Sequence, residues 1–237
     1  MNQFYAPNIL TDPVLPEDES HHAVKVLRLQ AGDSVIVMDG QGGMFHATIA
    51  VAHPKHCVVN SLERIEQKPV RDYYMHVAIA PTKNMDRLEW FVEKACEIGI
   101  DEISPIFCTF SERKVIKTDR IEKILVSAMK QSMQPVLTKL NEPCSFSDFM
   151  KRSDAIPGQK FIAHCHEAEK VMLAKAIEPH KHITVMIGPE GDFSQEEVEK
   201  AIAKGYTQVT LGDMRLRVET AALYSCSCAA VVNQLLL

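Results

Sequence analysis

The chain has 237 residues, of which 46% are hydrophobic and 24% are charged. That apolar share excludes an intrinsically disordered chain and predicts a folded protein with one large domain or two smaller ones. Its 26 Lys and Arg residues against 31 Asp and Glu residues give a net charge of −5, which excludes a histone-like basic coat. A local basic face for nucleic acid remains compatible with that balance.

The cysteine pattern predicts free thiols. The count is odd and no CxxC pair occurs; the seven are Cys57, Cys96, Cys108, Cys144, Cys165, Cys226 and Cys228. Most lie in apolar stretches, so buried thiols in a reducing cytoplasm are expected, with no zinc or other metal site. No secretory signal and no apolar run of about 18 residues is evident, so we expect a cytoplasmic protein without a membrane anchor.

Residues 1–71 have the pattern of a small β-barrel or β-sandwich. The expected elements are a helix over 21–29 and strands over 34–38, 44–49 and 58–62. Asp39-Gly40-Gln41-Gly42-Gly43 stands between two of these strands as a hairpin turn. Proline and charged residues over 66–72 interrupt every periodicity, so this segment is the predicted domain boundary.

Residues 72–237 alternate strands with helices. Strands are expected over 73–80, 103–107, 160–164, 182–188 and 207–211, and helices around 88–95, from Asp119, over 169–177, from Ser194 and over 219–236. Ser194-x-x-Glu197 has the form of a capping box. This order predicts an α/β domain with a mostly parallel sheet that helices cover on both faces.

Ligands of such sheets bind beyond the carboxyl ends of the strands. The most informative strand end is Gly188-Pro189-Glu190-Gly191, where glycines let backbone approach a ligand closely. An ordinary strand-to-helix turn explains the same residues equally well. The loop lacks a P-loop lysine and no GxGxxG occurs, so a phosphate cradle is not indicated. An acidic, backbone-rich pocket would suit a sulfonium cofactor with an adenine ring.

Two segments of the chain then resemble a known family. Residues 187–194 read IGPEGDFS and residues 211–221 read LGDMRLRVETA. Together they resemble the RsmE family, the 16S ribosomal RNA (uridine-1498 N3) methyltransferases of the knotted SPOUT class. The supporting segments are His21-His22 with Val26-Leu27-Arg28, Asp39-Gly40-x-Gly42, Lys83, Glu93-Lys94, Glu97-x-Gly99 and Ser111-Glu112-Arg113. In this order the set is specific and spans essentially the whole chain.

The resemblance implies two domains. A PUA-like β-barrel for RNA binding would occupy 1–71, and a SPOUT methyltransferase domain with a deep trefoil knot would occupy 72–237. It also implies S-adenosylmethionine as cofactor, a homodimer through the knotted domain, and 16S rRNA or the small ribosomal subunit as partner. Carried over by motif, the cofactor would contact His164, Ile187, Gly188, Pro189, Glu190, Gly191, Leu211, Gly212, Leu216, Thr220 and Ala221.

Methylation of uridine N3 requires loss of the imide proton and stabilisation of the negative charge that develops on the base. An arginine stabilises such a charge well. We therefore expect Arg217 to be the electrostatic partner and Glu219 to orient it or to accept the proton. The alternative for Glu219 is an ordinary carboxylate at a helix start. Met214 and Val218 stand where the family usually has arginine and threonine, which weakens the individual roles of this segment.

The N3 atom lies on the Watson–Crick edge, so the base must be unpaired or flipped out. The expected RNA contacts are His22, Lys25, Arg28, Lys83, Arg113 and Lys114. Residues 1–71 hold 6 basic and 8 acidic side chains, so any basic face is narrow. We therefore expect weak, salt-sensitive affinity for short naked RNA.

Two other functions stay open on the sequence alone. One is a knotted methyltransferase that acts on tRNA or on another ribosomal nucleotide. The other is an RNA-binding or ribosome-assembly factor that keeps the fold without the chemistry, which the residues at 214 and 218 would suit. An enzyme that binds nucleotide phosphates ranks behind both, because no phosphate loop is present.

Overall fold

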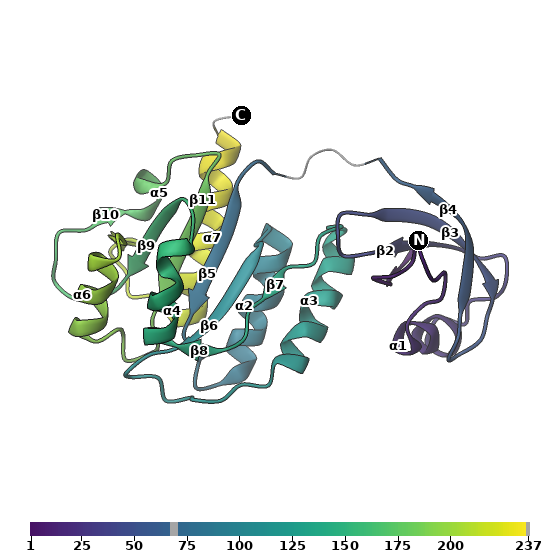
Figure 1. The fold of residues 1–237 in the computed structure, drawn as a ribbon, viewed down its shortest axis with the longest axis horizontal. Helices are drawn as coiled ribbons and strands as arrows, with labels where there is room; N and C mark the ends of the chain where they lie inside the picture. The colour runs from purple at the N-terminus through teal and green to yellow at the C-terminus, as the bar shows by residue number, and fades with distance from the viewer. Residues whose placement is uncertain (67–70, 236–237) are drawn as a thin grey trace. The chain divides into compact units, whose positions relative to one another are not determined.

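The computed structural model describes residues 1–66 and 71–235 (Figure 1). Contacts within the chain divide it into two compact units. The first unit contains the described residues up to 66 together with Val126–Leu137, and the second contains Arg71–Leu125 and the described residues from Thr138 onward. Among the described residues, no helix combines the length and the apolar character that crossing a membrane requires.

The first unit is built on a four-stranded sheet in the order β1-β2-β3-β4. The strands are β1 (Asn2–Tyr5), β2 (Ser34–Met38), β3 (Met44–Val51) and β4 (Val58–Arg64). The expected hairpin is confirmed, since β2 and β3 pair antiparallel around the turn. Asp39 Oδ1 accepts hydrogen bonds from the N–H groups of Gln41 and Gly43 at 2.7 and 2.8 Å, which closes that turn. Buried Phe4, Val35 and Phe45 belong to the core under the sheet.

The helix expected over 21–29 is wrong in its bounds. The chain instead forms α1 (Glu17–His21) and a π-helical turn, η1 (His22–Val26). Glu17, Asp18 and Glu19 lie in the first turn of α1, where carboxylates favour a helix start. The helical segment ends before Arg28, whose φ of 58° lies in the left-handed region.

The boundaries of the first unit also differ from the expected domain 1–71. Arg71 belongs to the second unit, where its guanidinium pairs with Asp101 at 2.8 Å. Conversely, the last turns of α3 (Thr118–Ser132) belong to the first unit. There Met129 packs with Met38 and Met44, and Lys130 Nζ lies 2.5 Å from Glu19 Oε1. The sequence-based boundary assumed that each domain is one continuous segment, so it could not show that residues 126–137 belong to the first unit.

The second unit is the expected parallel sheet. The strand order is β10-β12-β9-β11-β5-β6-β7, with β8 paired to β6, and every pairing is parallel. Its strands are β5 (Tyr74–Ile79), β6 (Glu102–Phe107), β7 (Lys139–Leu140), β8 (Cys144–Ser145), β9 (Gln159–Ala163), β10 (Val171–Met172), β11 (His182–Ile187) and β12 (Thr207–Thr210). The five strands expected in this region are confirmed as β5, β6, β9, β11 and β12.

Helices cover both faces of this sheet (Figure 1). They are α2 (Met85–Ile98), α4 (Phe146–Arg152), the 3₁₀ turn η2 (Ser153–Ala155), α5 (Leu173–Ala176), α6 (Gln195–Ala203) and α7 (Val218–Leu235). On one face α2 packs against α7, which also contacts β5 and β11. On the other, α4 and α6 share a core with Ala78 and Met186 of the central strands.

The helix expected over 169–177 is wrong. Val171 and Met172 pair instead with Val209 and Thr210 of β12, so backbone bonding at the sheet edge overrides helix periodicity. Only the four residues of α5 remain helical. Helix α4 was not expected, although Ser145 caps it by accepting a hydrogen bond from the Asp148 N–H at 3.0 Å.

Candidate active site

A cavity of about 660 Å³ lies at the carboxyl ends of β9, β11 and β12 in the second unit. We call it the carboxyl-edge cavity. Residues from three chain segments line it, 163–165, 187–192 without Gly191, and 209–221 without Thr220, together with Arg87 and Lys170. It is therefore placed where parallel α/β sheets bind their ligands.

The loop after β11 is fixed by its own turn and by its neighbours. The Asp192 N–H donates to the Pro189 carbonyl at 2.9 Å, which closes the turn. Glu190 Oε1 accepts from the Lys83 N–H at 2.9 Å, so this carboxylate holds the loop after β5. A Cβ atom at Gly191 would lie 2.9 Å from the Cβ of Phe110, so a glycine is required for this close approach.

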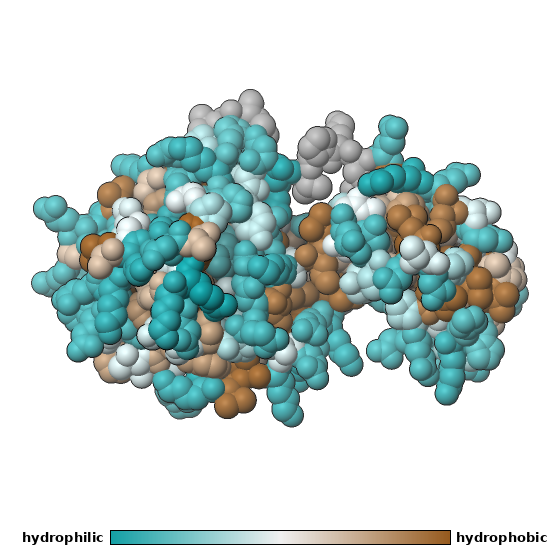
Figure 2. Space-filling model, viewed as in Figure 1, coloured by the Kyte–Doolittle hydropathy of each residue, from teal (hydrophilic) through white to brown (hydrophobic). Residues whose placement is uncertain are grey.

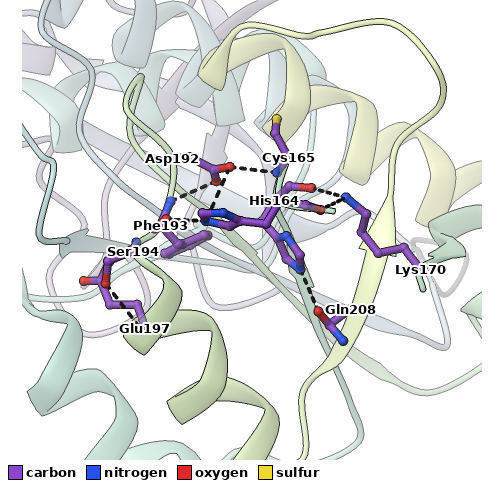
Figure 3. Close-up of polar contacts among 9 residues, drawn as sticks. His164, Cys165, Lys170, Asp192, Phe193, Ser194, Glu197 and Gln208 are labelled. Carbon is purple, nitrogen blue, oxygen red and sulfur yellow. Dashed lines mark hydrogen bonds and ion pairs between the residues drawn. The ribbon is translucent and has the colours of Figure 1, made fainter. Parts of the chain in front are cut away.

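Asp192 joins two of the three lining segments (Figure 3). Its Oδ2 accepts from the Cys165 N–H at 2.7 Å and its Oδ1 accepts from the Phe193 N–H at 2.8 Å. His166 Nε2 lies 2.7 Å from the Phe193 carbonyl oxygen. Lys170 Nζ donates to the carbonyls of His164 and His166 at 2.9 and 2.8 Å. The two loops thus form one hydrogen-bonded unit.

The capping box expected at the start of α6 is confirmed, and it reaches further than the helix. Ser194 Oγ accepts from the Glu197 N–H, while Glu197 Oε2 accepts from the Ser194 N–H at 2.9 Å. Glu197 Oε1 accepts in addition from the Thr109 N–H at 2.9 Å. The same carboxylate therefore attaches the turn after β6 to the start of α6.

His164 presents an unpaired nitrogen in the wall of the carboxyl-edge cavity. Its side chain is 7% exposed, and its Nε2 lies 3.0 Å from Gln208 Oε1 (Figure 3). Because an amide oxygen only accepts, Nε2 carries the proton and Nδ1 keeps its lone pair. Nδ1 is buried without a partner among the described residues. Burial, followed by the charge of Lys170, lowers the pKa of His164, so the imidazole is neutral at neutral pH.

The third lining segment is open toward solvent. Gly212 has a φ of 120°, and no atom lies within 4 Å of the position that its Cβ would take. The side chains of Met214, Arg215 and Arg217 are exposed. Neither guanidinium has an ion pair or hydrogen bond with another described residue. Both cations at this rim are therefore available to a ligand.

Glu219 has a different partner from the expected one. It is 8% exposed and lines the carboxyl-edge cavity. Its Oε1 lies 3.9 Å from Nε of Arg87 in the first turn of α2, whereas the described residues show no ion pair or hydrogen bond between Glu219 and Arg217. Its Oε2 is buried and has no hydrogen-bond partner among the described residues. Arg87 was missed in the sequence, although it lies in the first turn of the helix that follows β5.

Most of the expected cofactor residues lie together. Nine of them line the carboxyl-edge cavity: His164, Ile187, Gly188, Pro189, Glu190, Leu211, Gly212, Leu216 and Ala221. Gly191 and Thr220 do not, although they adjoin lining residues. Arg217 and Glu219 also line it. The expectation of an acidic pocket is wrong, because the lining contains as many Lys and Arg side chains as carboxylates, four of each.

The expected RNA residues fall in two groups. His22, Lys25 and Arg28 are exposed on the first unit. In the second unit, Lys83 is exposed and pairs with Glu112 at 2.9 Å. Arg113 donates to the carbonyls of Thr82 and Lys83 at 3.2 and 2.8 Å, and Lys114 donates to the Cys108 carbonyl at 2.8 Å. Arg113 and Lys114 thus hold loops at the edge where the carboxyl-edge cavity lies.

Comparisons with known proteins agree with this architecture. Residues 69–230 match the RNA methyltransferase domain family and residues 15–60 match the RNA methyltransferase PUA domain family. The ribosomal RNA small subunit methyltransferase E of Buchnera aphidicola is 26% identical over 94% of this chain and 86% of that protein.

Solved structures agree as well. The probable rRNA-methyltransferase from Porphyromonas gingivalis is 36% identical, covers both chains completely and has a TM-score of 0.92. The ribosomal RNA small subunit methyltransferase E from Neisseria gonorrhoeae, bound to S-adenosyl methionine, is 23% identical over 98% of both chains, with a TM-score of 0.82.

The fold and the carboxyl-edge cavity thus define an α/β RNA methyltransferase domain combined with a PUA-like domain. The chain belongs to the RsmE family of RNA methyltransferases. The family assignment expected from the loop motifs is confirmed, and so are the PUA-like and α/β parts of the fold class. The trefoil knot stays a prediction.

Proposed function

We propose that this protein transfers a methyl group from S-adenosylmethionine to N3 of uridine 1498 in 16S ribosomal RNA. The observation that carries the proposal is the meeting of three loops around one cavity whose rim holds the unpaired side chain of Arg217. The relatives named as small subunit methyltransferases E support the RNA substrate, and the structure from Neisseria gonorrhoeae supports the cofactor.

The residues present fit this cofactor. Ile187, Leu211 and Leu216 supply apolar surface for an adenine ring, and the open backbone at Gly212 permits close approach. The unpaired Nδ1 of His164 accepts a hydrogen bond from a ligand hydroxyl or amino group. Glu219 contributes negative charge that complements a cation. When bound, S-adenosylmethionine supplies a methyl group on a positively charged sulfur, which is a strong electrophile.

The side chains around the carboxyl-edge cavity then prepare the base. Arg217, exposed at the rim, stabilises the negative charge that develops on the uracil as N3 loses its proton. Glu219 is the proton acceptor, since its Oε2 has no hydrogen-bond partner within the described part of the chain. Positioning of N3 in line with the methyl group accounts for much of the remaining rate enhancement, since correct orientation alone can accelerate a reaction by several orders of magnitude.

Substrate RNA would contact basic residues of both domains. His22, Lys25 and Arg28 would contact phosphates from the PUA-like domain, and Lys83 would do so from the methyltransferase domain. Contacts of this kind position RNA without selecting its sequence. Arg113 and Lys114 would not contact the RNA themselves in this scheme. Their side chains already donate to backbone carbonyls, so they would hold the loops beside the site in place.

We also infer a homodimer through the methyltransferase domain. Helices α2 and α7 pack together, and Trp90, Tyr224 and Val231 on them are 44%, 40% and 51% exposed. Contiguous apolar patches, rather than single exposed apolar side chains, are typical of interfaces, and the proposed interface groups these three residues on two helices that pack together. Light scattering of the purified protein tests this, and a monomer at micromolar concentration would contradict it.

The decisive test of the reaction uses small ribosomal subunits whose 16S RNA lacks the methyl group. Incubation with the protein and S-adenosylmethionine should create a block to reverse transcription at uridine 1498, because a methyl group on N3 prevents base pairing. Mass spectrometry of the nucleosides should identify N3-methyluridine. The Arg217→Ala variant should lose about 100-fold or more in rate, while Arg215→Ala, at the same rim, should retain most of it.

The two alternatives give different results in the same assay. A methyltransferase for another nucleotide would modify tRNA or another position in ribosomal RNA and leave uridine 1498 unmodified. A non-catalytic assembly factor would bind subunits without any methyl transfer and would show no heat of binding with S-adenosylmethionine in calorimetry. Either result would refute the proposed reaction.

A further inference from the structure

A second cavity, of about 390 Å³, lies at the opposite end of the same sheet. It is surrounded by the first residues of four neighbouring strands, Tyr74 of β5, Glu102 of β6, Lys139 of β7 and His182 of β11. We call it the amino-edge pocket. It shares no lining residue with the carboxyl-edge cavity, and strands of six residues separate the two by roughly 15 to 20 Å.

The floor of the amino-edge pocket is a chain of hydrogen bonds across the sheet. Tyr74 Oη donates to Glu102 Oε2 at 2.9 Å. Asn141 Nδ2 donates to Glu102 Oε1 at 2.5 Å and to Ser104 Oγ at 2.7 Å. His76 Nε2 lies 2.8 Å from the same Oγ. Further along the same face of the sheet the side chains are apolar. The hydrogen-bonded network thus gives this end of the sheet a polar floor with one fixed arrangement of donors and acceptors.

The charges around the pocket favour an anion. Lys139 Nζ lies 2.8 Å from Glu102 Oε1 and neutralises that carboxylate. His76 is uncharged at neutral pH, since burial lowers its pKa to about 4. Arg152, at the end of α4, has no carboxylate partner among the described residues, and Nη2 donates only to Sγ of Cys144 at 2.9 Å. One exposed guanidinium therefore has no ion-pair partner among the described residues, although the charge of Asp148 acts on it from the same helix.

The walls of the pocket favour a planar ring. Phe149, Ile156 and Pro157 supply an apolar wall. On the rim, the rings of Tyr74 and His182 stack with centroids 4.3 Å apart and an interplanar angle of 15°. Helix α4, which brings Arg152 to this site, lies on the side of the second unit that is viewed in Figures 1 and 2, where the surface is mainly hydrophilic. Arg152 itself is exposed, so a charged ligand can reach it.

We propose that the amino-edge pocket binds a nucleoside monophosphate, with its phosphate on Arg152 and its base against the apolar wall. Arg152 provides the planar, two-pronged donor that phosphate oxygens prefer. The nucleotide is either a free metabolite or a residue of an RNA strand that extends away from the methylated base. This site is independent of the methyl-transfer reaction and of the cofactor.

Calorimetry with cytidine monophosphate tests the site, because cytidine is neither the cofactor nor the methylated base. We expect saturable binding that Arg152→Ala weakens about tenfold or more and that Arg152→Lys restores only in part. Arg217→Ala, in the other cavity, should leave this affinity unchanged. Cytidine without phosphate, and inorganic phosphate without a nucleoside, should each bind at least about tenfold more weakly.

The remaining comparisons decide the outcome. A single-stranded tetracytidylate that binds more tightly than the monophosphate, with the same loss in Arg152→Ala, assigns the site to an RNA strand, whereas equal affinity assigns it to a free nucleotide. No binding of cytidine monophosphate by the folded wild-type protein would overturn the proposal. Equal binding by Arg152→Ala, with its melting temperature unchanged, would overturn it as well, and so would equal affinity for inorganic phosphate.

Discussion

Nε of Arg87, in the first turn of α2, lies 3.9 Å from Oε1 of Glu219, in the first turn of α7. Two residues that are far apart in the sequence thus form an ion pair in the wall of one cavity. Glu219 is 8% exposed, so little water competes for this carboxylate. The pair explains why a charged Glu219 is stable there, and it makes Arg87 a positioning residue for the proposed reaction.

The Arg87→Ala variant should therefore lose methyl transfer without losing the cofactor. Leaving a buried carboxylate without its partner costs about 1 to 3 kcal/mol, so we expect kcat to fall about 10- to 100-fold. The affinity for S-adenosylhomocysteine, measured by calorimetry, should change little. Arg87→Lys should recover part of kcat, because a charge remains. Loss of binding in equal proportion to kcat would contradict a positioning role.

His164 should contribute to binding of the cofactor through Nδ1. The His164→Ala variant should bind S-adenosylhomocysteine about tenfold more weakly, which corresponds to one hydrogen bond of about 1.4 kcal/mol. His166→Ala is the matched control in the neighbouring position, since its Nε2 bonds to the Phe193 carbonyl instead. An unchanged dissociation constant for His164→Ala would show that Nδ1 faces no ligand atom.

The stability of the second unit should fall in mild acid because of His76. Burial lowers the pKa of His76 from 6.5 to about 4, so the unfolded chain takes up a proton before the folded protein does. Stability from this group is present above pH 6.5 and is lost as the pH falls from 6.5 toward 4, by up to about 3 kcal/mol. Burial alone would raise the pKa of nearby Glu102, but hydrogen bonds from Lys139 and Asn141 outweigh this effect and lower the pKa to about 2.

Chemical denaturation between pH 7 and pH 5 measures this effect, because Glu102 stays ionised over that range. The His76→Gln variant should show a smaller fall in the free energy of unfolding across this range than the wild type does. His56→Gln, at an exposed position of the first unit, should reproduce the wild-type fall. If both variants follow the wild-type curve, His76 is not the responsible group.

Cys165 should be the cysteine that reports on ligand binding. It is exposed and lines the carboxyl-edge cavity, whereas burial raises the pKa of Cys96 to about 11 and also raises the pKa of Cys108 and Cys226. N-ethylmaleimide should therefore modify Cys165 first in the native protein. Saturation with S-adenosylhomocysteine should slow that reaction, and peptide mass spectrometry would identify the modified thiol.

The PUA-like domain should contribute phosphate contacts through Lys25 and Arg28. The double variant Lys25→Gln with Arg28→Asn removes both cations, and Asn tolerates the left-handed backbone at position 28. Its RNA affinity should depend less steeply on salt, with a change in logarithmic slope of about 1 to 2. Lys55→Gln, which removes another exposed lysine of the same domain, should leave the slope unchanged.

Much of this architecture was predictable because it is encoded locally. Short, largely apolar segments between the helices predicted β5, β6, β9, β11 and β12 within one or two residues, and Ser194 with Glu197 predicted the start of α6. The three loops of the carboxyl-edge cavity follow from those strands, since carboxyl ends of parallel strands lie along one edge. Nine of the eleven expected cofactor residues line the cavity for this reason.

The features that were missed depend on contacts between distant segments. The pairing of β10 with β12 decides the structure of Val171 and Met172, and the sequence around them has only a helical period. Arg87 looks like any helix-start arginine until α7 brings Glu219 beside it. The second cavity assembles from the starts of four strands, none of which has a recognisable motif.

The hydrogen bonds of Asp192 have a thermodynamic consequence. Both of its carboxylate oxygens accept from backbone N–H groups, of Cys165 and of Phe193, so two of the three lining loops are preorganised before a ligand arrives. Binding to those two loops loses little conformational entropy, whereas Met214, Arg215 and Arg217 of the third segment have exposed side chains that a ligand would order. A cofactor and an RNA that both order this segment would help each other bind.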